Sequence, residues 1–179
     1  LFMPDRKIWS GESKILLMKE KEIISLFDNH PVLPGLLKTV SSAETARIRA
    51  EGLSGSSKAI IIAKIFLETQ LTHVVIVPEK EEAAYLYNDL VSLAGEDSVF
   101  FFPSTYKRSV QYEKTEPANI VLRTEVLNHL ASGKRKGIII TYPESVMEKV
   151  ISRSNLKKNT LQINKGDRLS LEFFEEVLQ

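Results

Sequence analysis

Three short apolar runs, separated by segments of helix length, constrain the fold of this chain more than any other feature. The runs are His73–Val77 (HVVIV), Ser98–Phe102 (SVFFF) and Gly137–Thr141 (GIIIT). Short runs rich in β-branched and aromatic residues are typical of strands buried in a parallel sheet. Parallel neighbours need a crossover, and residues 80–93 and 117–131 have the apolar spacing of crossover helices. The sequence therefore predicts an α/β fold with a parallel sheet and helices on both faces.

The first 70 residues add three helices and one more strand to this expectation. Apolar residues cluster on one side of residues 19–29, and a second short helix is expected over residues 35–39. Residues 45–51 alternate between apolar and polar side chains, which is typical of a strand. Residues 57–69 have the broad apolar face of a buried helix.

A degenerate phosphate-binding loop lies between this expected strand and helix. The intact motif is Gly, four residues, Gly-Lys, then Ser or Thr. Its backbone N–H groups and helix N-terminus hold the phosphates, its lysine reaches them, and its hydroxyl binds Mg²⁺. Here Gly52 and Lys58 have the right spacing, but Ser57 replaces the second glycine and Ala59 replaces the hydroxyl residue. A side chain at position 57 is unfavourable if the backbone there needs a glycine conformation. Ala59 has no group that could bind a metal.

The loop has two interpretations. It is either a tight turn that keeps an ancestral shape or a weak nucleotide site. In the second case the phosphate would be held by Gly52, Gly55, Ser56, Ser57 and Lys58. Lys58 is then a phosphate contact; otherwise it faces solvent or pairs with a carboxylate such as Glu79, because an unpaired cation near a helix N-terminus is unfavourable.

Hydrolysis would also need an acidic metal-binding strand end, usually Asp-Glu. The corresponding positions read Val77-Pro78-Glu79 and Tyr142-Pro143-Glu144, where proline disrupts that pattern. The sequence therefore assigns no catalytic residue and no metal ligand. It favours ancestry from a nucleotide site without hydrolysis.

Charged and aromatic residues between residues 104 and 125 form a second group of candidates. Tyr106, Lys107 and Arg108 place an aromatic ring beside two cations, a composition that can stack on bases and contact phosphates. This is the candidate nucleic-acid contact. Arg123 and Glu125 could pair with loop residues or line the face near this contact, and a surface salt bridge is the more common outcome.

Composition excludes several classes of protein. The chain has 179 residues, a net charge of +1 and no cysteine. No strong overall field attracts nucleic acid, and disulfides, thiol catalysis and Cys-based zinc sites are impossible. The longest purely apolar runs are far too short for a bilayer, and charged residues interrupt the first residues where a signal peptide would be apolar. A cytoplasmic protein without a membrane partner is expected.

The expected division of the chain follows from these segments. Residues 1–30 are an N-terminal lead and helix, and residues 31–150 are the degenerate P-loop, helicase-like domain. Residues 151–179 change character, with a short alternating strand at 161–163, a turn at 165–167 and a helix at 169–178. They are expected to be the start of a small α+β module.

The ordered set of these motifs resembles the N-terminal region of bacterial transcription-repair coupling factors, which is itself similar to the excinuclease subunit UvrB. The matching segments cover residues 31–179. They are Gly52-Leu53-Ser54-Gly55-Ser56, Val74-Val75-Ile76-Val77-Pro78, Phe101-Phe102-Pro103, Glu116-Pro117, Arg123-Thr124-Glu125-Val126-Leu127-Asn128, Gly137-Ile138-Ile139-Ile140 and Lys165-Gly166-Asp167-Arg168-Leu169. The intact Gly-Lys-Thr ending and the Tyr-rich insertion of UvrB itself are missing.

The resemblance implies a helicase-like region without catalysis, into which a UvrA-binding module is inserted from residue 151. The residues that contact UvrA would follow Gln179, so none is assigned here. ATP and Mg²⁺ would bind in the motor domains of the parent protein and not in this region. RNA polymerase and double-stranded DNA would bind other domains of that parent. The alternative function is a working nucleotide-binding P-loop NTPase or helicase domain that tolerates Ala59.

Overall fold

The computed structural model describes residues 20–42, 45–105, 116–133 and 136–158 of this chain. The chain divides into two compact units, residues 1–148 and residues 149–179. The described part of the second unit contains one helix, α8 (Arg153–Lys158). The expected strand at 161–163 and helix at 169–178 lie outside the described residues.

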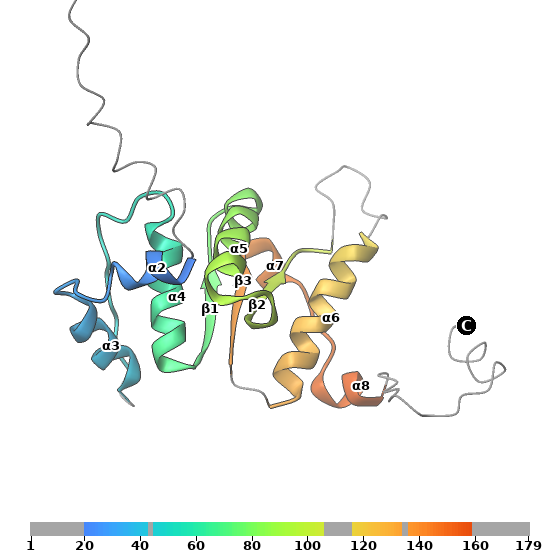
Figure 1. Ribbon diagram of the computed structural model, residues 1–179. Coiled ribbons are helices and arrows are strands. Elements are labelled where there is room, and N and C mark those ends of the chain that lie inside the picture. Colours follow the sequence, from blue (N-terminus) through green and yellow to red (C-terminus); the bar gives the residue numbers. More distant parts are fainter. Residues whose placement is uncertain (1–19, 43–44, 106–115, 134–135, 159–179) are drawn as a thin grey trace, which may run out of the picture. The chain divides into compact units, whose positions relative to one another are not determined.

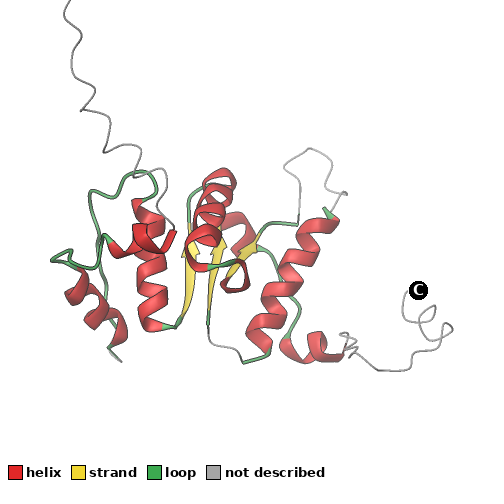
Figure 2. Ribbon diagram, in the orientation of Figure 1, coloured by secondary structure: helices red, strands yellow, loops and turns green. Residues whose placement is uncertain are grey.

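A three-stranded parallel sheet forms the centre of the first unit (Figure 2). Its strands are β1 (Thr72–Ile76), β2 (Val99–Phe102) and β3 (Gly137–Thr141), in the spatial order β1-β3-β2. Ile139 at the middle of β3 lies between Val74 of β1 and Phe100 of β2. The predicted α/β class and the parallel arrangement are confirmed.

Helices precede the sheet and connect its strands (Figure 1). They are α2 (Glu20–Ser25), α3 (Leu33–Ser41), α4 (Ser57–Thr69), α5 (Lys80–Ala94), the 3₁₀ turn η1 (Glu96–Ser98), α6 (Pro117–Ala131) and α7 (Pro143–Met147). The predicted helices at 57–69 and 117–131 are confirmed at both ends. The helix expected at 19–29 is described only from Glu20 and ends earlier, at Ser25, and the one expected at 35–39 extends to both sides as α3.

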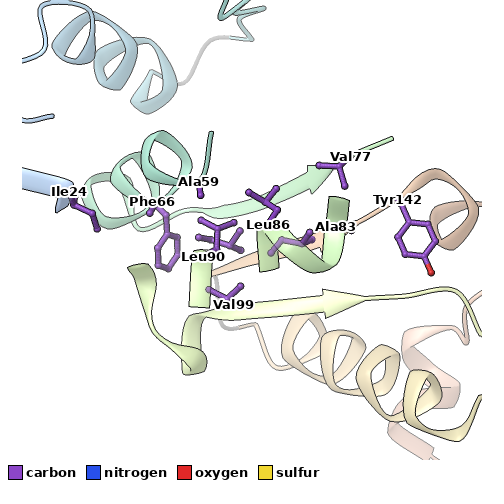
Figure 3. Close-up of a cluster of buried hydrophobic side chains, with 12 residues drawn as sticks. Ile24, Ala59, Phe66, Val77, Ala83, Leu86, Leu90, Val99 and Tyr142 are labelled. Carbon is purple, nitrogen blue, oxygen red and sulfur yellow. The ribbon is translucent and has the colours of Figure 1, made fainter. Parts of the chain in front are cut away.

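The two faces of the sheet are covered by different helices. On one face, Val99 and Ile138 join Ala63 of α4 and Leu90 of α5 in the hydrophobic core (Figure 3). On the other face, α6 packs on β2, where the ring of His129 lies 4.3 Å from the ring of Phe100, measured between centroids. The expectation of helices on both faces is therefore confirmed.

The strand expected at residues 45–51 is wrong. Residues 45–50 form an exposed loop, and Arg49 pairs there with Glu51 at 2.8 Å. Period-two alternation marks a strand only when one set of side chains finds a surface to cover, and here the alternating residues remain exposed.

The three strands differ in how much of their side-chain surface is buried. Every residue of β3 is buried, as expected of the central strand. Val74 and Ile76 of β1 are 60% and 57% exposed, because β1 is an edge strand among the described residues. The expectation that all three runs are fully buried therefore holds for β3 and not for β1, and in β2 only Val99 is buried while the three phenylalanines are partly buried.

No helix in the described ranges, 20–42, 45–105, 116–133 and 136–158, is long and apolar enough to cross a membrane.

Candidate functional site

The degenerate phosphate loop is a tight turn that leads directly into α4. Gly52 and Gly55 have positive φ angles of 78° and 53°, a conformation that favours glycine. Ser57 is the first residue of α4, and its backbone has none of the positive φ that would make its side chain costly. Its N–H and its hydroxyl both donate to the carbonyl of Ser54, at 3.2 and 2.6 Å. The turn is therefore stabilised by its own hydrogen bonds, and Ser57 causes no strain.

Lys58 is paired with a carboxylate of the same domain. Its Nζ donates to Oε1 of Glu82 at 2.9 Å, and the two side chains are 50% and 39% exposed. The suggested partner Glu79 is not the one in the structure. Glu79 is the N-cap of α5 with an extended backbone, whereas Glu82 lies inside the first turn of α5, which packs against α4. The carboxylate of Glu82 thus neutralises the positive charge of Lys58, which a bound phosphate would neutralise in an intact loop.

Ala59 occupies the position of the metal-binding hydroxyl in an intact loop. It has no solvent exposure and belongs to the hydrophobic core, together with Ala63 and Ala83. Residue 59 therefore faces the packed core of the domain. In the described part of the chain, no group of three or more His, Cys, Asp or Glu residues could hold a metal ion.

An apolar groove of about 440 Å³ lies beside the loop. Its walls come from α3, residues 48–53, α4, β1 with residues 77–78, and α5, and the charged residues in its lining are Lys58 and Glu82. Phosphate sites need several converging N–H donors or cations. The lining of the groove is mostly apolar, and its one cation, Lys58, is paired with its one carboxylate, Glu82.

A second polar cluster lies at the carboxyl ends of β2 and β3, centred on Arg123 of α6. Arg123 is 6% exposed. Its Nη1 donates to the carbonyls of Pro103 and Ser145 at 2.8 and 3.2 Å, and its guanidinium carbon lies 4.1 Å from the centroid of the Phe102 ring. Burial lowers the pKa of Arg123, while Glu148 opposes that shift; arginine remains charged at neutral pH in any case. The surface salt bridge expected for Arg123 is therefore wrong, because its side chain is buried among backbone carbonyls.

Glu148 follows α7 and completes this cluster. Its Oε2 lies 3.4 Å from Nη1 of Arg123. Its carboxylate also accepts hydrogen bonds from the hydroxyl of Ser104, the N–H of Thr105 at 3.1 Å and the hydroxyl of Thr105 at 2.9 Å. Burial alone would raise the pKa of Glu148, but the hydrogen bonds from Ser104 and Thr105 and the charge of Arg123 outweigh burial and lower it. A carboxylate with this many donors is a weak general base.

Further bonds fix the chain on either side of residues 104–105. The N–H of Ser104 donates to the phenol oxygen of Tyr142 at 2.8 Å, and the amide of Asn119 donates to the carbonyl of Ser104 at 2.7 Å. The N–H of Glu116 donates to the carbonyl of Thr105 at 3.2 Å. The cluster therefore joins the loop after β2, the start of α6 and the segment after β3. Its geometry is that of a structural clamp.

Comparison with known proteins identifies one informative similarity. No protein-family model matches the chain. The chain is 30% identical over 116 residues to the transcription-repair-coupling factor of Haemophilus influenzae. It is similar to a transcription-repair coupling factor. The match covers 64% of this chain and 10% of that relative, so the chain matches about a tenth of the length of the coupling factor.

The sequence predicted two groups of residues. Gly52, Gly55, Ser56, Ser57 and Lys58 lie together in the turn before α4 and in the first residues of this helix. The candidate nucleic-acid contact, Tyr106, Lys107 and Arg108, lies outside the described residues. Glu148, Ser104, Thr105, Asn119 and Tyr142 were missed, and the available signal was an arginine at position 123, directly after the apolar run Ile120–Leu122 of the expected helix.

Proposed function

We propose that this chain is the UvrB-like N-terminal region of a transcription-repair coupling factor and that it serves there as a non-catalytic interaction and regulatory region. The observation that carries the proposal is the similarity to the Haemophilus influenzae coupling factor over 116 residues. The motifs that resemble that family occur in order over residues 31–179 of this chain.

The geometry of the loop supports the non-catalytic part. Lys58 is neutralised by Glu82, the N–H of Ser57 is bonded to Ser54, and Ala59 is packed in the core. Phosphoryl transfer needs a lysine on the phosphates and a metal held by a hydroxyl and an acidic strand end. The region is therefore proposed to keep the shape of a helicase domain without its ATPase chemistry.

The role of the parent protein follows from the family. The parent is proposed to be a cytoplasmic, ATP-dependent DNA translocase that displaces stalled RNA polymerase and recruits excision repair. ATP and Mg²⁺ would bind its motor domains, and RNA polymerase and double-stranded DNA would bind other parts of it. UvrA would bind the module that begins near residue 151.

Two measurements on the full-length protein test this proposal. Replacing Lys58 by Ala should leave its rate of ATP hydrolysis unchanged, because hydrolysis belongs to other domains. Removing the second unit, from Lys149 onward through the module, should abolish retention on immobilised UvrA while hydrolysis persists. Retention that survives this deletion would contradict the recruitment role.

The alternative is a working nucleotide-binding P-loop domain. Two observations favour it: Lys58 has the spacing of the motif, and both loop glycines have the positive φ of a tight loop. Loss of ATP hydrolysis in the Lys58→Ala protein, with Lys80→Ala on the neighbouring helix α5 as a matched control, would support this alternative.

A further inference from the structure

Glu148 is the last residue of the first unit, and Lys149 begins the second. The side chains that hold its carboxylate, Ser104, Thr105 and Arg123, all belong to the first unit. The point at which the chain leaves this unit is therefore fixed to the loop after β2 through a single side chain.

Helix α7, which leads to Glu148, has little apolar anchoring of its own. It has five residues, and Val146 and Met147 are 51% and 84% exposed. Ser145 is fully buried, and its carbonyl accepts a hydrogen bond from Arg123. Arg123 and Glu148 therefore supply much of what holds α7 in place.

The bonds of Glu148 are of the stronger kind. Each hydrogen bond to its carboxylate is charge-assisted, and the side chains of Arg123 and Glu148 are only 7% and 13% exposed. Loss of either partner leaves the other charge buried without compensation. The loop after β2 and the end of α7 are therefore expected to be held together or to loosen together.

We propose that Glu148 is a latch that couples the loop after β2 to the end of α7, so that a rearrangement where the chain enters the second unit is transmitted to Ser104 and Thr105. Release of the carboxylate removes hydrogen bonds from both segments at once and weakens their attachment. The latch is independent of the proposed repair function, because every contact that forms it lies within the first unit.

Amide hydrogen exchange in the 179-residue chain, followed by NMR, tests this coupling. The Thr105 N–H donates to Glu148 itself, whereas the Ser145 N–H donates to the carbonyl of Tyr142 at 3.1 Å and has no bond to Glu148. In Glu148→Gln, both amides should exchange at least about tenfold faster than in the wild type. The amide of Ile139 in β3 reports global opening and should change less, and Glu81→Gln on the exposed side of α5 is the matched control.

A second variant separates a latch from a local bond. Thr105→Val removes one hydroxyl donor and keeps the pair of Arg123 and Glu148. Under the proposal it still accelerates exchange at Ser145, to a smaller extent than Glu148→Gln. Acceleration confined to Thr105, or equal acceleration at Thr105, Ser145 and Ile139, would overturn the latch.

Discussion

The guanidinium of Arg123 and the carboxylate of Glu148 lie 3.4 Å apart, and both side chains are almost completely removed from solvent. A buried pair of this kind is worth little compared with a well-packed apolar pair, yet breaking it is costly because one charge stays behind. Here the carboxylate is shared with Ser104 and Thr105. The pair therefore links the segments that follow β2 and β3. Substitutions of either residue should change the stability of this edge of the sheet.

Replacing Arg123 by Met should destabilise the domain by about 3–5 kcal/mol, because Glu148 then remains buried without its cation. Urea denaturation measures this change. The double variant Arg123→Met with Glu148→Gln should lose less than the sum of the two single variants, since it leaves no buried charge. Additive losses would show that the two residues act separately.

The free energy of unfolding should fall in acid through Glu148. Its folded-state pKa is lowered from an ordinary value of 4.5, so the unfolded chain takes up the proton first as the pH falls. The contribution is fully present above pH 4.5 and is lost as the pH falls through the lowered pKa. Urea unfolding at pH 7 and at successive values below pH 4.5 measures the loss. Glu148→Gln should show a shallower pH dependence there, and an unchanged slope would contradict the assignment.

Replacing Ala59 by Thr, which restores the hydroxyl of an intact phosphate loop, should destabilise the domain by about 1–3 kcal/mol. Ala59 has no exposure in the core, so the added atoms have no space and the hydroxyl has no guaranteed partner. The melting temperature measures this effect, with Ala84→Thr at an exposed position of α5 as the control. A stable Ala59→Thr protein that binds Mg-ADP would contradict the placement of this residue.

The two lysines of α4 should differ in their contribution to stability. Lys58 is half exposed in its pair with Glu82, so Lys58→Ala should change the free energy of unfolding by at most about 1 kcal/mol. Lys64 is 13% exposed between Asp28 and Glu68, and the hydrogen bonds that it donates to these two carboxylates raise its pKa. Lys64→Ala should therefore cost more than Lys58→Ala in the same denaturation experiment. Equal losses of unfolding free energy in the two variants would show that burial of the Lys64 ion pairs adds nothing to stability.

The sequence predicted the elements whose ends carry local signals. Helix α6 begins at Pro117, Gly133 with its positive φ follows the end of this helix, and β3 begins at Gly137. Proline and glycine mark the ends of helices because of their backbone preferences. Residues 45–51 had the right period for a strand, but residues 45–50 form an exposed loop. The prediction therefore failed where packing, and not local pattern, decides the structure.

The candidate site shows the same limit. The loop glycines follow from a local motif, and their positive φ angles agree with it. The pairing of Lys58 with Glu82 depends on how α4 packs against α5. The contact of Arg123 with Glu148 depends on the order of β2 and β3 in the sheet. Neither pairing has a sequence spacing from which it could be derived.

We propose that this domain keeps the phosphate loop as a shape and not as a nucleotide site. A thermal melt of the chain with and without millimolar Mg-ADP, repeated with Lys58→Ala, tests it most directly. A ligand at about 100 times its dissociation constant stabilises a protein by roughly 2.7 kcal/mol, which is several degrees at this size. We predict the same melting temperature with and without Mg-ADP in both proteins. A rise of several degrees in the wild type that disappears in Lys58→Ala would contradict the claim.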